Sequence, residues 1–351
     1  MEAMSLRALG WSDARQEQFH SIAIEGLEPA RVVAVHRGVY VGLAASGEVN
    51  ARPTGRFLHK ATAGEMPAVG DWIAIEHDGQ NARIHAVLER STKFARKVAG
   101  DETEEQVLVA NVDIVFLVSA LNSDFNPRRI ERYLVTAFSS GARPVIVLTK
   151  ADLCDDAALR ALEVETVAPG TDVVVTSSIT GEGFSELTDY AQPGVTLALL
   201  GSSGVGKSTI VNALAGRDLQ HVKGIRNDGK GRHTTTHREL FVLPSGALII
   251  DTPGMRELQL WDAETGLDPT FADIAALAAG CRFADCAHRT EPGCAVRQAS
   301  ADGTLDADRL AAYRKLEREL AYLERKQDKR AQADESRKWR ALTKAMRSKQ
   351  R

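Results

Sequence analysis

The segment Gly201-Ser202-Ser203-Gly204-Val205-Gly206-Lys207-Ser208 has the residue types and spacing of a loop that holds phosphate groups. It follows the apolar run VTLALL and precedes a helical pattern through Ile210–Leu214, which is the strand–loop–helix context that such a loop requires. Glycines let backbone N–H groups face phosphate oxygens, and the start of the helix adds a favourable dipole. We expect Lys207 to reach the β- and γ-phosphates, Ser208 to ligate Mg²⁺, and the residues from Gly201 through Thr209 to contact a nucleotide. The alternative is a chance Gly/Ser-rich turn, and the flanking strand and helix argue against it.

A second segment could read the base of that nucleotide. Thr149-Lys150-Ala151-Asp152 ends the apolar run PVIVLT. A carboxylate at Asp152 can accept both N–H donors of guanine, and adenine offers no such pair, so the segment predicts GTP rather than ATP. Thr149 stands where Asn is more usual, and a hydroxyl makes fewer hydrogen bonds than an amide. A helix cap at Asp152 is the competing interpretation. Ser177 and Ser178 follow the next strand, DVVVT, where a base-contacting loop is expected.

Residues for a magnesium ion follow the phosphate loop. Asp251 ends the strand ALIID and could hold Mg²⁺ through water, and the N–H of Gly254 could meet the γ-phosphate. The polar, glycine-rich segment GIRNDGKGRHTTTHREL lies between the loop and this strand, as expected for a segment that nucleotide and Mg²⁺ would order. One of three consecutive threonines should supply a second hydroxyl ligand, and the spacing does not choose among Thr234, Thr235 and Thr236.

The residue that would activate water is less obvious. Met255 follows DTPG, where many GTPases place a Gln, and a thioether cannot orient water. His233 is the nearest candidate, because an imidazole can position or deprotonate water near neutral pH. An exposed histidine without a catalytic role is the alternative.

Three of the four cysteines lie in one short stretch. Cys281, Cys286, His288 and Cys294 form the pattern C-x4-C-x-H-x5-C. Three thiolates and one imidazole suit a closed, structural Zn²⁺ site. The alternative is three reduced cysteines in a small core. Cys154 is interpreted as a small loop residue.

Three zones position these groups. Residues 1–108 carry the β-type runs RVVAVH, VYVGLAA, DWIAIE and RIHAVL, which suit a small β-barrel, although other all-β folds share the pattern. In residues 109–263 apolar strands alternate with helical stretches, which is typical of a parallel, doubly wound sheet, and ELFVL and ALIID end this zone as a hairpin. Residues 264–351 hold the cysteine cluster and a charged helical stretch that ends in a basic tail.

Composition limits the class of protein. The chain has 351 residues, 44% of them hydrophobic, and a net charge of −3, which fits two to three globular domains and by itself predicts no nucleic-acid partner. From Arg337 to Arg351, however, every charged residue is Lys or Arg, and Trp339 lies among them. This end suits RNA phosphates and a stacking contact, and a solvated helix is the alternative. No apolar run approaches the roughly 18 residues of a membrane span, and the N-terminus lacks a secretory signal, so we expect a cytoplasmic protein without a membrane partner.

The order of the motifs is inverted, because the segment that reads guanine precedes the phosphate loop. The order Thr149–Asp152, Ser177, Gly201–Ser208, Thr235 and Asp251–Gly254 resembles that of the circularly permuted GTPases. Within them, the chain is similar over nearly its whole length to the ribosome small subunit-dependent GTPase A family. The resemblance rests on the stretches EEQVLVANVD, GSSGVGKST, GRHTTTHREL, IIDTPG and CRFADCAHRTEPGCAV.

The resemblance implies an α/β fold in three parts: an N-terminal OB-fold barrel from about residue 25 to 95, a circularly permuted P-loop GTPase domain at 109–263, and a small α-helical zinc-binding domain at 264–351. It implies a GTP hydrolase that the ribosome stimulates and that acts late in maturation of the small (30S) subunit. GTP and GDP, the subunit and its rRNA would be its partners, and we expect a monomer. By motif position, His233 would be catalytic and Thr235 would bind Mg²⁺.

Two other functions remain open. The first is an RNA-binding assembly factor in which nucleotide acts only as a conformational latch, and Met255 favours it. The second is a permuted GTPase that serves the large subunit. That family typically has Asn at the position of Gly204 and lacks this zinc pattern.

Overall fold

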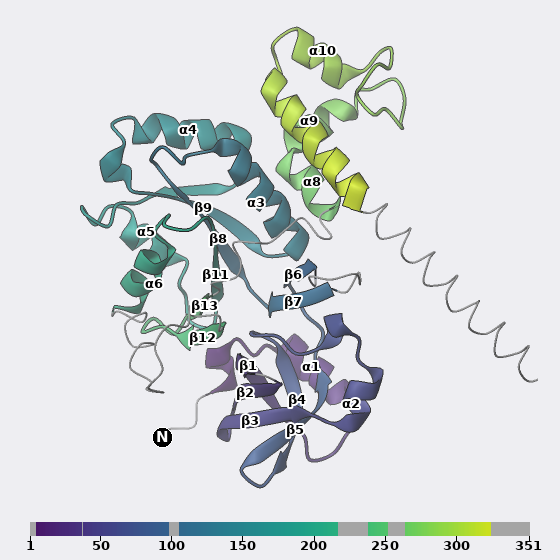
Figure 1. The fold of residues 1–351 in the computed structure, drawn as a ribbon, viewed down its shortest axis with the longest axis vertical. Helices are drawn as coiled ribbons and strands as arrows, with labels where there is room; N and C mark the ends of the chain where they lie inside the picture. The colour runs from purple at the N-terminus through teal and green to yellow at the C-terminus, as the bar shows by residue number, and fades with distance from the viewer. Residues whose placement is uncertain (1–4, 37, 98–104, 217–237, 252–263, 324–351) are drawn as a thin grey trace, which may run out of the picture.

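The computed structural model describes residues 5–36, 38–97, 105–216, 238–251 and 264–323. His233, Thr235, Gly254 and the basic C-terminal end lie outside these residues, so their expected roles stay predictions. Figure 1 shows a β-barrel at the N-terminal end, a sheet flanked by helices, and a separate group of helices toward the C-terminus. No helix among the described residues is long and apolar enough to cross a membrane.

Five strands form the barrel. They are β1 (Glu28–His36), β2 (Val39–Ala44), β3 (Gly47–Pro53), β4 (Trp72–Asp78) and β5 (Asn81–Val87). Their order is β1-β2-β3-β5-β4, and a β1–β4 pairing closes the barrel. This closed five-stranded arrangement is that of an OB-fold. The sequence pattern did not single out β3, because only Val49 and Ala51 of its side chains are apolar and buried.

Short helices and one strand pair surround the barrel. The helices are η1 (Leu6–Leu9), α1 (Asp13–Ser21), α2 (Gly55–Lys60) and η2 (Ala63–Glu65), and the strands are β6 (Lys93–Lys97) and β7 (Glu105–Ala110). The fully buried Arg31 of β1 joins the barrel to the sheet, because its guanidinium donates to Asn111 O at 3.1 Å and to Thr196 Oγ1 at 2.9 Å. Burial lowers the pKa of Arg31 to about 10.

The sheet carries the chemistry predicted from the motifs. Its strands are β8 (Ile114–Ala120), β9 (Arg143–Thr149), β10 (Asp172–Val175), β11 (Thr196–Leu200), β12 (Glu239–Val242) and β13 (Leu248–Asp251). The order is β10-β9-β8-β11-β13-β12, with β12 antiparallel to β13 and the other neighbours parallel. Every residue of β8 and β11 is buried, which explains their unbroken apolar runs.

Helices cover both faces of this sheet. They are α3 (Pro127–Ser140), α4 (Ala157–Val167), α5 (Phe184–Asp189) and α6 (Lys207–Ala215), with the short η3 (Ala151–Leu153) after β9. Side chains of α3 and α4 belong to one hydrophobic cluster, and side chains of α5 and α6 belong to another. The predicted doubly wound arrangement is therefore confirmed.

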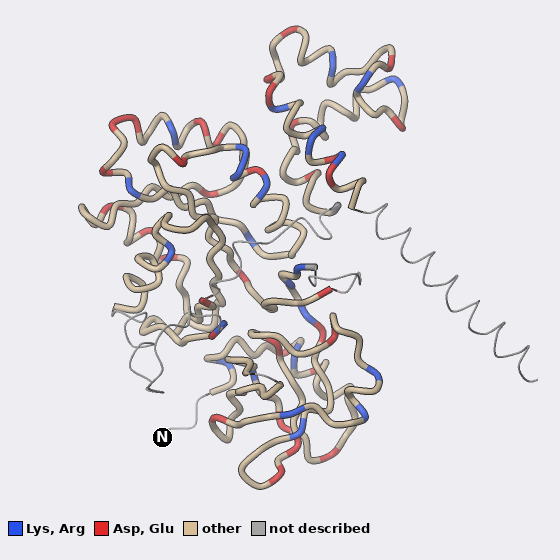
Figure 2. Tube along the Cα trace, in the orientation of Figure 1, with Lys and Arg blue, Asp and Glu red and all other residues tan. Residues whose placement is uncertain are grey.

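The C-terminal helices form their own core against α3. They are α8 (Glu264–Thr270), α9 (Ala272–Ala278), α10 (Ala295–Ala301) and a helix at residues 307–323. Gly266 of α8 permits close packing, because a Cβ there would lie 2.1 Å from Val135 O. Basic and acidic residues are interspersed over all three parts (Figure 2). The barrel, the α/β sheet and the helical C-terminal part together confirm the expected fold class.

Candidate functional site

The predicted nucleotide-binding residues that the structure describes gather at one edge of the sheet. The carboxyl ends of parallel strands meet at the same edge, and ligands bind in the crevice outside it. Asp152 follows β9, Ser177 follows β10, the phosphate loop follows β11 and Asp251 ends β13. Because β8 and β11 lie between β9 and β13, the inverted order along the chain becomes a continuous row in space.

The phosphate loop crosses closely over strand β8. A Cβ at Gly201 would lie 2.3 Å from Val118 O, so only glycine fits there. Gly206 has φ +103° and caps the start of α6 in a left-handed conformation that favours glycine. Lys207 Nζ donates to the carbonyl oxygens of Gly201 at 2.7 Å and Ser202 at 2.5 Å, so its ammonium group lies within the curve of the loop.

The base-reading segment presents an exposed carboxylate. Asp152 is exposed, and the hydroxyl of the fully buried Ser177 donates to its Oδ1 at 2.5 Å. The same hydroxyl accepts from the N–H groups of Ile179 at 3.2 Å and Thr180 at 3.3 Å. Ser177 therefore fixes the orientation of the Asp152 carboxylate through Oδ1, and the other carboxylate oxygen is left for a ligand. Ser178 is exposed beside it.

Thr149 connects the two halves of the site. Its buried hydroxyl donates to Val205 O of the phosphate loop at 2.5 Å. The sequence alone suggested that Thr in place of Asn would lose hydrogen bonds in the base-reading segment. The structure gives this hydroxyl a specific partner in the loop, 56 residues away along the chain.

The expected magnesium residues lie on neighbouring elements. Ser208 is exposed in the first turn of α6, and Asp251 is half-buried at the end of β13, which pairs with β11 directly before the loop. A hydroxyl and a carboxylate are oxygen ligands of the kind that Mg²⁺ prefers. The donor set therefore fits this ion.

Two residues of α3 reach the phosphate loop and a third, in the turn before the helix, holds one of them; the motifs did not predict any of the three. Arg129 Nη1 donates to Ser202 Oγ at 2.9 Å, and Tyr133 Oη lies 3.4 Å from the same oxygen. Asp124 accepts from both terminal nitrogens of Arg129, at 2.6 and 3.0 Å. No motif marks them, and the only sequence signal is the Asn-Pro helix start at Asn126, which predicts the helix but not its contact.

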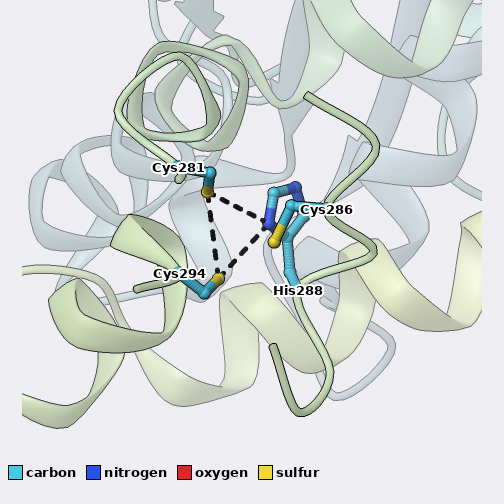
Figure 3. Close-up of side chains that lie close together, drawn as sticks. All are labelled: Cys281, Cys286, His288 and Cys294. Atoms are coloured by element: carbon cyan, nitrogen blue, oxygen red, sulfur yellow. Dashed lines mark hydrogen bonds between the residues drawn. The ribbon is translucent and has the colours of Figure 1, made fainter. Parts of the chain in front are cut away.

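The four predicted zinc ligands converge in the C-terminal part (Figure 3). The Sγ atoms of Cys281 and Cys294 are 3.9 Å apart, and His288 Nδ1 lies 3.6 and 3.5 Å from them. Ligands around a tetrahedral Zn²⁺ with the usual bond lengths lie about 3.5 to 3.8 Å apart. With Cys286, all four ligand atoms lie within 4.8 Å of one another, so the donor set fits zinc.

The thiols of the cluster differ in how readily they ionise. Desolvation raises the pKa of the Cys281 thiol, but hydrogen bonds from the amides of Val296 and Ala295 and with Cys286 and Cys294 outweigh it, and the pKa is lowered overall. Desolvation raises the pKa of the Cys286 thiol to about 11. Cys294 accepts from the N–H of Arg297 at 3.4 Å and caps α10. Arg314 donates to the carbonyl oxygen of His288 and ties the site to the helix at 307–323.

A buried arginine fixes the C-terminal part to α3. Arg309 donates to Glu131 of α3 at 2.7 Å, to Asp273 of α9 at 2.9 and 3.1 Å, and to Val167 O of α4 at 2.9 Å. Burial lowers the pKa of Arg309, but the hydrogen bonds to Asp273 and Glu131 outweigh burial and raise it overall. Arg132 and Glu319 form a second link, at 2.6 and 2.8 Å.

Comparison with known proteins identifies the family of this chain. The sequence profile described as RsgA GTPase matches residues 87–261. "Small ribosomal subunit biogenesis GTPase RsgA" of Opitutus terrae is 48% identical, over 99% of this chain and 98% of its own length. The protein of that name from Syntrophotalea carbinolica is 46% identical, over 95% of each chain.

Solved structures with the same architecture are also similar. YjeQ from Thermotoga maritima superposes with a TM-score of 0.63 at 28% identity, over 84% of this chain and 99% of its own. YloQ, described as a circularly permuted GTPase, superposes with a TM-score of 0.61 at 26% identity, over 85% of this chain and 96% of its own. With its permuted motif order, its nucleotide-binding edge and its cysteine–histidine cluster, this chain belongs to the RsgA family of circularly permuted GTPases.

Proposed function

We propose that this protein hydrolyses GTP to GDP and phosphate on the small ribosomal subunit, late in the maturation of that subunit. The observation that carries the proposal is the hydrogen bond from Thr149 to Val205 O, which joins the base-reading segment to the phosphate loop in one site. The subunit is inferred from the names of relatives that match nearly the whole chain.

Within this site, each residue has a defined task. Asp152 accepts the guanine N–H groups, Ser177 holds its carboxylate in place, and the amides of the phosphate loop with Lys207 bind the β- and γ-phosphates. Ser208 and Asp251, with Thr235, would hold Mg²⁺, which neutralises phosphate charge when bound. We assign His233 to positioning the attacking water and the N–H of Gly254 to the γ-phosphate.

The C-terminal cluster has a structural task in this proposal. Four protein ligands leave no position for a reacting water, which is typical of a structural zinc site rather than a catalytic one. Zinc bound there would hold the loop between α9 and α10 against the helix at 307–323, and this part with the barrel would contact rRNA. We further infer a cytoplasmic, monomeric protein.

Phosphate release from GTP, measured with and without purified small subunits, tests the proposal. We expect slow release by the protein alone and a clear stimulation by small subunits but not by large subunits. Asp152→Asn should abolish phosphate release at the same GTP concentration. Stimulation by large subunits only, or by neither, would refute the assignment.

A nucleotide latch is the second candidate, and Met255 in place of a water-orienting side chain favours it. His233→Ala separates the two functions, with exposed His20→Ala as the matched control. If His233→Ala stops hydrolysis and cells still mature their small subunits, the latch is correct. If both are lost, hydrolysis is the function.

A further inference from the structure

We propose that Arg129 is a positioning residue for the phosphate loop, acting through the side chain of Ser202. The proposal rests on the proposed function, because it concerns the site where that function places the nucleotide. Arg129 belongs to α3, outside every motif that identified the site, and it would set nucleotide affinity without touching the nucleotide itself.

Two cationic side chains donate hydrogen bonds to different atoms of Ser202. Lys207 Nζ donates to its carbonyl oxygen at 2.5 Å, and Arg129 Nη1 donates to its hydroxyl at 2.9 Å. Tyr133 Oη lies 3.4 Å from the same hydroxyl, one helical turn after Arg129. Ser202 follows Gly201, where the loop leaves β11, so the side chain is held at the point that sets the direction of the loop.

The carboxylate of Asp124 fixes the orientation of the Arg129 side chain. Asp124 accepts from both of its terminal nitrogens, at 2.6 and 3.0 Å, and hydrogen bonds from Arg129 hold the pKa of Asp124 below its ordinary value. The carboxylate also balances the guanidinium charge. Arg129 therefore contributes orientation to the loop more than attraction to phosphate, which is why we assign it a positioning role.

Helix α3 is a rigid platform for this contact. Asn126 caps its first turn by accepting from the N–H groups of Arg128 and Arg129. On its other side, Glu131 is bound to Arg309 at 2.7 Å and Arg132 to Glu319 at 2.6 Å. A site residue whose supporting contacts are locked in this way loses little entropy when the ligand binds.

Removing the contact should weaken GDP and GTP alike. Both nucleotides use the phosphate loop, so the interaction contributes equally to ground state and transition state, and KM should rise while kcat stays nearly constant. The loss of one hydrogen bond to a charged group in a half-exposed position should weaken nucleotide binding roughly five- to tenfold.

A double-mutant cycle tests the proposal on the full chain. Dissociation constants for a fluorescent GDP would be measured for wild type, Arg129→Met, Ser202→Ala and the double variant. We expect each single variant to bind roughly five- to tenfold more weakly, and the double variant to stay within about twofold of the weaker single. Arg129→Lys, which can reach Ser202 or Asp124 but not both, should recover part of the loss.

Arg83→Met is the matched control, because Arg83 makes a similar two-nitrogen pair with an exposed aspartate in the barrel, at 2.8 and 2.9 Å. It should bind GDP as wild type does. Additive effects of Arg129→Met and Ser202→Ala, or wild-type affinity in either single variant, would overturn the positioning role. Absence of GDP binding by the wild type would instead overturn the proposed function.

Discussion

Removing the charge of Arg309 should release the C-terminal part from the GTPase sheet. Arg309→Met keeps most of the side-chain volume but removes the cation–π contact with Phe271, whose ring centroid lies 4.3 Å from the guanidinium carbon. It removes the hydrogen bonds to Glu131, Asp273 and the carbonyl oxygens of Thr270 and Val167. The change therefore tests charge and hydrogen bonding more than packing.

The free-energy cost of Arg309→Met depends on the carboxylates that lose their partner. The Glu131 side chain is 0% exposed, and one of its oxygens has no partner among the described residues even with Arg309 present. Breaking a buried ion pair by removing one partner costs about 3 to 5 kcal/mol. Arg128 remains 2.9 Å from Glu131, and Asp273 is 34% exposed and can be hydrated, so we expect the lower end, about 3 kcal/mol. This corresponds to a roughly 150-fold larger population of the opened state.

Hydrogen exchange of the backbone amides in residues 264–323 measures this opening directly. Arg143→Met removes an exposed pair, with side chains 62% and 45% exposed, and should change the opening free energy by less than about 1 kcal/mol. Adding Glu131→Gln to Arg309→Met removes the stranded charge and should restore part of the protection. If Arg309→Met behaves like Arg143→Met, or the second change restores nothing, the reasoning about buried charge is wrong.

Four further outcomes are expected. Asp152→Asn should shift preference from GTP to xanthosine triphosphate in competition binding, and unchanged selectivity would contradict the base assignment. Thr149→Val strands the buried Val205 carbonyl and should weaken GDP and GTP alike by about tenfold, measured by titration. Elemental analysis should find one zinc per chain, lost on strong chelation together with amide protection between α9 and α10; zinc content near zero before chelation would reject the site. The hydrogen bond from Arg132 lowers the pKa of Glu319. The Arg132–Glu319 pair therefore stabilises the packing of the C-terminal part on α3 fully above pH 4.5, the ordinary pKa of Glu, and less as the pH drops below it. Arg132→Met should flatten that acid-side dependence of hydrogen exchange.

Particular elements show which parts of the structure could be predicted from the sequence. The strands β8, β9 and β11 were predicted because parallel strands covered on both faces read as unbroken apolar runs. The zinc ligands were predicted because three thiolates and an imidazole in one short stretch are the donor set of a closed zinc site. β3 was missed although its segment GEVNARP alternates, because only two small apolar side chains, Val49 and Ala51, mark its buried face, and it gains its place by pairing with β2 and β5.

Within the nucleotide site, the chemistry of single residues was readable and the contacts between segments were not. The phosphate loop and Asp152 could be assigned because phosphate and guanine demand particular groups at particular spacings. The bond from Thr149 to Val205 O and the contact of Arg129 with Ser202 join residues that are 56 and 73 positions apart. Such contacts depend on strand order and helix packing, and no local spacing encodes them.

The sequence by itself determined that the chain carries a permuted set of GTPase motifs and a zinc-ligand set, because these depend on residue type and local spacing. Only the tertiary structure decided what the permutation leaves intact. Parallel strands bring their carboxyl ends to one edge whatever their order along the chain, so the base-reading segment and the phosphate loop still meet there. The structure also decided that α3, which carries no motif, lies between the phosphate loop and the C-terminal part, since one face of that helix contacts Ser202 and another binds Arg309.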